Sequence, residues 1–273
     1  MTKIAFIGCG NMASCIINAI LKDKDDSLSL IASGPHIEKL EKFKALGIDI
    51  TTDNSAAASI SNIIFLGVKP QILPDVLNNM IKMGVCFKNK LVISMAVGFS
   101  CKSIADIIKS DKIVRIMPNT PSSISLGVSA VFFDKGCNDS DKVITKKLLT
   151  NLGLSIFVDD EEKITTLGAI TGSGPAFIYK FLEALSDIAI EKGFNEDETR
   201  LFIEQLILGT ATLIVKNHDT KLSTMREAVT SKGGTTFEGL KIMDKNNFKR
   251  MMCDTIDACI RRSHELESIL KDK

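Results

Sequence analysis

Short hydrophobic runs alternate with amphipathic segments through the first half of the chain. The runs have the length of buried strands and cover residues 3–8, 28–33, 62–68, 91–97, 113–117, 126–134 and 154–159. Helical spacing of apolar residues fills the intervals at 11–22, 36–47 and 71–83, and one more helix is expected between the last two runs. Because strands buried on both faces are continuously apolar, this alternation predicts an α/β fold with a doubly wound, mostly parallel sheet over residues 1–160.

The strand pattern stops near residue 160, and long helical patterns follow over 174–193, 196–217 and 248–270. These helices are apolar around most of their circumference. Such a helix has to be buried, and a second copy of the chain can provide the covering surface. The sequence therefore predicts an all-helical, dimerising domain over residues 161–273. The acidic segment "VDDEEK" (158–163) is the expected hinge between the two domains.

The composition favours a small-molecule partner over a nucleic acid or a membrane. The 273 residues are 45% hydrophobic and 25% charged, which is typical of a soluble globular protein, and the formal net charge is +1. No basic stripe follows any expected helix, and the chain has no Trp and one Tyr, so a surface for nucleic acid is not expected. The longest apolar stretch, 201–215, contains Glu204 and is too short to cross a bilayer.

The cysteine and histidine positions do not indicate a metal site or a disulfide framework. Seven cysteines are present without a Cys-x-x-Cys pair, and the three histidines have no partner at a recognisable spacing. A reducing compartment fits these free thiols. The first expected strand begins at Lys3, which leaves no room for a targeting peptide, so we expect a cytoplasmic protein without a metal.

The N-terminal segment "IAFIGCGNMA" has the pattern of a dinucleotide-binding turn. Gly8, Gly10 and Ala13 follow a strand and open a helix, with Asn11 and Met12 between them. The first glycine permits the tight turn, the second lets a pyrophosphate approach the backbone, and the small third residue lets the helix lie close to the strand. The helix N-terminus provides partial positive charge for the phosphates. A Rossmann-type domain that binds NAD(P) follows from this arrangement.

The end of the second strand favours NADPH over NADH. An Asp or Glu is expected there if the ribose 2′-hydroxyl is bound, but the segment reads "IASGPH", with Ser33 and Gly34. This site admits a 2′-phosphate, which His36 or Lys39 can help to neutralise. The alternative is that Ser33 and Gly34 are ordinary turn residues and that cofactor selectivity is loose.

Two further loops are expected at the same edge of the sheet. "GVKP" (67–70) places Lys69 at the carboxyl end of a strand, where ligands of open α/β sheets gather, with Pro70 fixing the exit of the chain. "MPNTP" (117–121) follows a later strand. Either Asn119 and Thr120 line the nicotinamide side, or the two prolines only block a helix.

Two turns of small residues precede helices in the second half. "GSGPAF" (172–177) has Pro175 in a position suited to a first helical turn, and "SKGGTT" (231–236) precedes another helix. Both can present backbone N–H groups to a carboxylate. A Gly-Gly turn can also be a simple joint between helices, but a dinucleotide domain needs a substrate pocket elsewhere in the chain.

Taken in order, these motifs resemble the pyrroline-5-carboxylate reductase family over essentially the full length. The matching segments are "FIGCGNMA", "GVKP", "MPNTP", "GSGPAF" and "VTSKGGTT". The last is the most specific, because the family turn reads Val-x-Ser-Pro-Gly-Gly-x-Thr. Lys232 stands where the family usually has Pro, which removes a residue that stiffens the turn and adds a cation near a site for an anionic substrate.

The resemblance implies reduction of the cyclic imine 1-pyrroline-5-carboxylate to L-proline, with NADPH or NADH as the cofactor. It implies a homodimer through the helical domain, often assembled into larger rings. Thr236 is the hydroxyl expected near the ring nitrogen, and Glu161 matches a position near bound product. The carboxylate-binding turn consists of Ser231, Gly233, Gly234 and Thr235. The remaining cofactor contacts are Ser33, Asn54, Val68, Lys69, Pro70, Ala96 and Val97.

There are two alternatives, one within enzymes and one from another class. β-Hydroxyacid dehydrogenases place a catalytic Lys after a glycine-rich turn and an Asn one turn later. Lys180 follows "GSGPAFIY", but Glu183 and Ala184 stand a turn later, so Lys180 is interpreted as a helix-surface residue. A non-catalytic dinucleotide sensor would bind NADPH without oxidising it, but it has no need of a second-substrate turn.

A protonated imine is already electrophilic, so its reduction needs orientation more than a strong acid or base.

Overall fold

The apolar runs of the first half form one eight-stranded sheet in a computed structural model that describes residues 1–271. The strand order is β3-β2-β1-β4-β5-β6-β7-β8. Every neighbouring pair is parallel except β6 and β7. The strands are β1 (Thr2–Ile7), β2 (Leu28–Ser33), β3 (Asp49–Thr51), β4 (Ile63–Leu66), β5 (Leu91–Ser94), β6 (Ile113–Met117), β7 (Gly127–Phe133) and β8 (Gly153–Val158). The predicted mostly parallel sheet is confirmed, and the short β3 is an addition to it.

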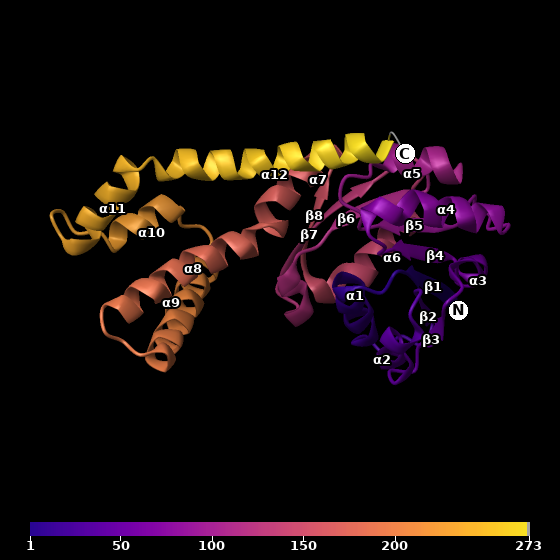
Figure 1. Cartoon of the computed structure of the whole chain (residues 1–273), viewed down its shortest axis with the longest axis horizontal. Coiled ribbons are helices and arrows are strands. Elements are labelled where there is room, and N and C mark those ends of the chain that lie inside the picture. The colour runs from indigo at the N-terminus through magenta and orange to yellow at the C-terminus, as the bar shows by residue number, and fades with distance from the viewer. Residues whose placement is uncertain (272–273) are drawn as a thin grey trace. The chain divides into compact units, whose positions relative to one another are not determined.

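Helices cover both faces of this sheet (Figure 1). They are α1 (Asn11–Leu21), α2 (Glu41–Lys44), α3 (Asn54–Ile60), α4 (Leu73–Lys82), α5 (Cys101–Ile108), α6 (Asp139–Leu149) and α7 (Glu162–Leu167). Successive residues of a strand point to opposite faces, so Phe6 joins a core cluster with Ile16 of α1, whereas Ile7 joins one with Leu77 of α4. This two-sided burial explains why the central strand β4 is apolar and buried at every position.

The helix predicted over 36–47 is wrong in its extent. The segment contains a 3-10 turn, Ile37–Lys39, and the four-residue α2. Between His36 and Lys44, only Leu40 and Phe43 reach the core, so packing supports little more than one helical turn there.

Five helices follow in the second half: α8 (Gly174–Glu191), α9 (Glu196–Lys216), α10 (Leu222–Ala228), α11 (Thr235–Lys245) and α12 (Phe248–Lys271). The helical prediction is confirmed there, and α10 is an addition to it. Asn195 begins α9 in a capping box with Glu198, which satisfies two backbone groups at the turn after α8 (Figure 1). None of the described helices is long and apolar enough to cross a membrane.

The chain divides into two compact units: Met1–Ser173 together with the chain from Ala258 onward, and Gly174–Asp257. In the second unit, Thr199 and Ile203 are the buried residues, and many large apolar side chains are exposed. Exposed apolar faces of this extent are typical of an interaction surface. These compact units divide between Ser173 and Gly174, whereas the boundary predicted at residue 160 lies just after the end of the last strand. As a functional division, the boundary at residue 160 stays a prediction.

Candidate active site

The predicted cofactor residues of the first unit lie along one edge of the sheet. They follow the carboxyl ends of five neighbouring parallel strands, β3, β2, β1, β4 and β5. Asn54 follows β3, Ser33 ends β2 and the glycine turn follows β1. Lys69 and Val97 follow β4 and β5. Ligands of open α/β sheets bind at this edge, so the structure brings the predicted residues together where a dinucleotide would lie.

Position 8 accommodates only glycine. Its φ is +87°, and a Cβ atom there would lie 2.6 Å from the backbone nitrogen of Val68. A Cβ atom on Gly67 would lie 2.4 Å from the carbonyl oxygen of Gly8. The turn after β1 and the loop after β4 are therefore in direct backbone contact, and both glycines are needed for it.

Gly10 opens helix α1 and faces open space. A Cβ atom added at Gly10 would meet nothing within 4 Å, and no side chain caps the helix. The first backbone N–H groups of an uncapped helix are available to an anion, which makes this terminus suited to a pyrophosphate. Burial raises the pKa of the adjacent Cys9 thiol to about 11, so this thiol is neutral near pH 7 and packs as a small apolar group.

A hydrogen bond from Ser33 holds the side chain of Asn54. The Ser33 side chain is fully buried, and its hydroxyl donates to Asn54 Oδ1 at 2.6 Å. Asp53 accepts hydrogen bonds from the N–H groups of Ser55 and Ala56, which fixes Asn54 at the start of α3. Asn54 is therefore the partly exposed polar group of this pair. His36 is exposed and lies 3.4 Å from Glu38, and Lys39 is an exposed cation of the segment after β2.

A cavity of about 280 Å³ lies beyond the ends of β5 and β6. It is lined by Val97, Met117, Pro118, Thr165, Gly168, Ala169, Gly172, Ser173, Cys259 and Ser263. In the strand order, β5 and β6 lie on the opposite side of β1 from β3, so the cavity lies away from Asn54. The nicotinamide half of a dinucleotide is expected on that side. Of these residues, Val97 is a predicted cofactor contact, and Gly172 and Ser173 belong to the predicted "GSGPAF" turn. The others were not proposed as site residues from the sequence.

Asn119 stabilises the surroundings of this cavity and does not line it. Its amide nitrogen donates to the carbonyl oxygen of Thr171 at 2.9 Å, and its oxygen accepts from the N–H of Val128 at 2.9 Å. Asn119 is buried and Thr120 is exposed, and neither lines the cavity. Met117 and Pro118 of the same segment do so instead.

A π-helical segment, Gly168–Gly172, forms part of the cavity wall. A Cβ atom on Gly168 would lie 3.1 Å from Met117 Cγ, so the small residue lets the segment approach β6. Single π turns inside helices often occur at functional sites. The "GSGPAF" motif begins at the end of this segment, and Pro175 lies in the first turn of α8 as predicted.

Glu161 is engaged within the first unit. Its Oε1 atom lies 3.0 Å from Nη1 of Arg115 and accepts the backbone N–H of Cys101 at 2.7 Å. The predicted proximity of Glu161 to bound product stays a prediction.

The "SKGGTT" segment forms a tight turn in the second unit. The Gly234 N–H donates to the Ser231 carbonyl oxygen at 3.0 Å, and Gly233 has a φ of +70°. Lys232 is not among the described residues with positive φ, so this is a type II turn with Lys232 at its second position. Proline is favoured at that position because its fixed φ fits, and lysine adopts the same conformation without strain.

This turn leads into an uncapped helix N-terminus. Gly234 is the N-cap of α11, and no side chain accepts from the first-turn N–H groups. Ser231, Thr235 and Thr236 are exposed beside these groups. Backbone donors with adjacent hydroxyl groups suit a carboxylate, and the helix dipole favours its charge. The residues predicted to bind the substrate carboxylate are thus brought together on one short segment.

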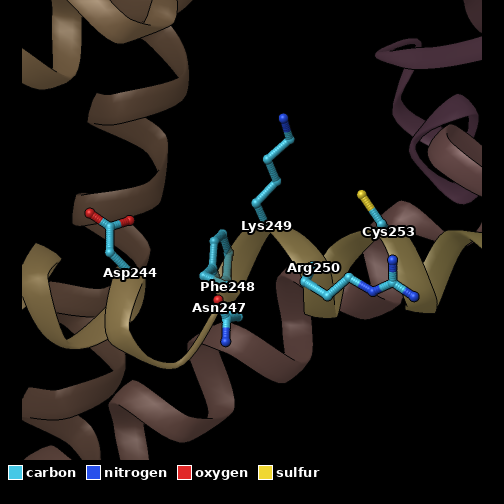
Figure 2. A pocket seen from close by; sticks show the side chains of 6 residues that line it. All are labelled: Asp244, Asn247, Phe248, Lys249, Arg250 and Cys253. Carbon is cyan, nitrogen blue, oxygen red and sulfur yellow. The ribbon is translucent and has the colours of Figure 1, made fainter.

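Two other cavities of the second unit lie near α11. One of about 360 Å³ is lined by Lys232, together with Arg226 and Lys241 among others. The other, of about 340 Å³, is lined by six residues, and Figure 2 shows Lys249 and Arg250 leaving α12 in different directions. Arg250 also pairs with Asp254 at 2.9 Å, so the cations of this second cavity do not converge on an anion site.

Lys180 is a helix-surface residue, as interpreted from the sequence. Its Nζ atom lies 2.6 Å from Glu183 Oε2, and this hydrogen bond raises the pKa of Lys180. A lysine held protonated on an exposed helix face is unsuited to act as a base.

The described residues contain no cluster of three or more His, Cys, Asp or Glu side chains that could hold a metal ion.

The fold and its cofactor site define an NAD(P)-dependent oxidoreductase. Residues 3–98 match the family model described as NADP oxidoreductase coenzyme F420-dependent, and residues 161–266 match that described as pyrroline-5-carboxylate reductase dimerisation. The chain is 36% identical to the pyrroline-5-carboxylate reductase of Vibrio alginolyticus, over 98% of both chains. The chain therefore belongs to the pyrroline-5-carboxylate reductase family.

Solved structures agree with this assignment. A pyrroline-5-carboxylate reductase from Coxiella burnetii superposes with a TM-score of 0.86 at 32% identity, covering 97% of this chain and 98% of that one. The Plasmodium falciparum pyrroline carboxylate reductase with NADP bound gives a TM-score of 0.84 at 26% identity, with the same coverage. The helical half of the chain is accordingly a dimerisation domain, which accounts for its exposed apolar faces.

Proposed function

We propose that this protein reduces the cyclic imine 1-pyrroline-5-carboxylate to L-proline with NADPH, the last step of proline biosynthesis. The observation that carries the proposal is the type II turn Ser231–Gly234 at the uncapped N-terminus of α11. It presents backbone donors and hydroxyl groups to a carboxylate in a chain that also has a dinucleotide site. The named relatives, which match over nearly the full chain, support the same reaction.

The substrate residues would bind and orient the imine. The N–H groups at the start of α11, with Ser231 and Thr235, would hold the carboxylate. The Thr236 hydroxyl would hydrogen-bond to the ring nitrogen and fix which face of the imine is reduced. Bound NADPH would supply a hydride to the imine carbon. A protonated imine accepts a hydride readily, so orientation is the main task of these residues.

The cofactor residues would hold the dinucleotide along the edge of the sheet. Gly8, Gly10 and the first amides of α1, from Asn11 to Ala13, suit the pyrophosphate. Asn54, supported by Ser33, would contact the adenosine ribose, and Lys39 lies on the segment after β2, where it can help to neutralise a 2′-phosphate. Val68, Lys69, Pro70, Ala96 and Val97 would continue the site toward the nicotinamide.

The proposal extends to location and assembly. All seven cysteines are free, which suits the reducing cytoplasm. A homodimer would cover the apolar faces of α8 and α9, and further assembly into a ring follows the family pattern.

The proposal is tested by following the nicotinamide absorbance with 1-pyrroline-5-carboxylate and each cofactor in turn. We expect imine-dependent oxidation with both cofactors and a higher kcat/KM with NADPH, because β2 ends in Ser33 and Gly34 follows it, so no acid at the strand end repels a 2′-phosphate. Cofactor binding without imine-dependent oxidation would instead identify a dinucleotide sensor and contradict the proposal.

A further inference from the structure

Arg115 is a buried cation in the middle of an otherwise apolar strand. It lies on β6 between Val114 and Ile116 and is 3% exposed. Its Nη1 atom is 3.0 Å from Glu161 Oε1. Its Nε atom is buried without a hydrogen-bond partner in the part of the chain that the structure describes. A guanidinium group in this setting is costly to bury, so its presence needs an explanation beyond packing.

The same carboxylate oxygen links β6 to the start of α5. Glu161 Oε1 also accepts the backbone N–H of Cys101, the first residue of that helix, at 2.7 Å. Burial raises the pKa of the Cys101 thiol, so the side chain stays neutral and its contribution here is the backbone N–H. Arg115 therefore holds Glu161, and Glu161 holds the N-terminus of α5.

The segment between β5 and α5, residues 95–100, is fixed at both ends by these contacts. At its start, the Ala96 N–H donates to Ser94 Oγ at 3.2 Å, and at its end Cys101 is bound by Glu161. In the middle, Gly98 has a φ of +73°, and a Cβ atom there would lie 3.0 Å from Leu266 Cβ of α12. Val97 of this segment lines the cavity where the nicotinamide is expected.

Glu162, next to Glu161, anchors the other wall of that cavity. Its carboxylate lies 2.8 Å from His264 Nε2 of α12, and α12 contributes Cys259 and Ser263 to the lining. Both walls of the cavity are thus tied to the chain at residues 161 and 162. A shift of Glu161 would displace Val97 through the Cys101 backbone at the end of segment 95–100. It would displace the α12 side chains through the contact of Glu162 with His264.

Stability alone does not explain the buried Arg115–Glu161 ion pair. Replacing a buried ion pair with apolar residues of similar volume is often neutral or stabilising, whereas removing one partner is destabilising. We propose that Arg115 and Glu161 are positioning residues that hold segment 95–100, and with it Val97, against the nicotinamide ring. The inference rests on the proposed function only for turnover, because cofactor binding can be measured alone.

The test compares R115M/E161L, which removes both charges, and E161Q, which removes the charge and keeps an acceptor oxygen. The matched control is D141N, which breaks the Lys112–Asp141 pair of 2.9 Å in the same unit. Asp141 is buried in α6 and lies outside segment 95–100. The readouts are the fluorescence of bound NADPH, the rate of hydride transfer in a single turnover, and Tm.

We expect both Arg115–Glu161 variants to alter the fluorescence of bound NADPH and to slow hydride transfer by about tenfold or more, because small misplacements are costly to rate. The double variant should keep Tm near that of the native protein. D141N should lower Tm and leave both cofactor readouts unchanged. If E161Q and the double variant keep native fluorescence, or if D141N changes it equally, the inference is wrong. Absence of imine reduction in the native protein would contradict the proposed function alone, since the fluorescence comparison does not depend on it.

Discussion

Replacing Thr236 with alanine is expected to lower kcat by about 100-fold while changing the Kd for NADPH less than about twofold. Thr236 lies in the exposed first turn of α11, in the second unit, whereas the predicted dinucleotide residues lie in the first. The change removes the hydroxyl proposed to hydrogen-bond to the ring nitrogen. Alanine is a good helix former, so the helix itself should be preserved. Steady-state kinetics and an NADPH titration measure the two quantities separately.

The matched control is Thr236→Ser, which keeps the hydroxyl and removes a methyl group. It should retain most of the native kcat if the hydroxyl is what matters. Equal losses of turnover and of cofactor affinity in the alanine variant would count against the role proposed for Thr236. So would a serine variant as slow as the alanine one.

The second large effect is expected at the turn after β1. A methyl group on Gly8 would lie 2.6 Å from the Val68 nitrogen at a φ of +87°, so Gly8→Ala should displace the loop after β4. Backbone strain of this kind costs about 1–3 kcal/mol before the steric clash is counted. We expect a lower Tm and a Kd for NADPH raised by about 100-fold or more. Thermal unfolding and fluorescence titration provide the measurements.

Gly10→Ala separates binding from folding at the same turn. Gly10 has a φ of −73°, and an added Cβ atom would meet nothing within 4 Å, so Tm should stay near the native value. The methyl group would nevertheless occupy the space through which a pyrophosphate approaches the backbone, and NADPH affinity should fall. If Gly10→Ala bound NADPH normally, the pyrophosphate would not lie at this turn.

The sequence was sufficient to predict elements whose residues are buried in a regular pattern. The central strands of the sheet were recognisable because both of their faces are covered, which makes runs such as Ile63–Leu66 continuously apolar. Glycines at fixed spacing identified the turn after β1, where local geometry demands them. The short β3 and α10 were missed because three and seven residues contain too little periodicity to be distinguished from a loop.

The cavity beyond the ends of β5 and β6, where the nicotinamide is expected, was largely missed because its walls depend on tertiary contacts. Gly168 and Ser263 are far apart in the chain, and nothing in their local sequence marks them. Met117 begins the "MPNTP" loop, but the sequence drew attention to Asn119 and Thr120 of that loop instead. The π-helical segment has no sequence signature distinct from an α-helix. Arg115 lies in the run "IVRIM", where a single charge gave no sign that Glu161 would be its partner. Asn119 was noticed, but its two hydrogen bonds depend on strand β7 and the π-helical segment.

The proposed function requires the backbone donors at Ser231–Thr236 to hold the carboxylate of a five-membered ring substrate. A crystal structure of the assembled enzyme with L-proline would show whether they do. We expect proline oxygens at hydrogen-bond distance, about 2.7–3.2 Å, from the N–H groups at the start of α11. Proline bound elsewhere, with this turn empty, would contradict it.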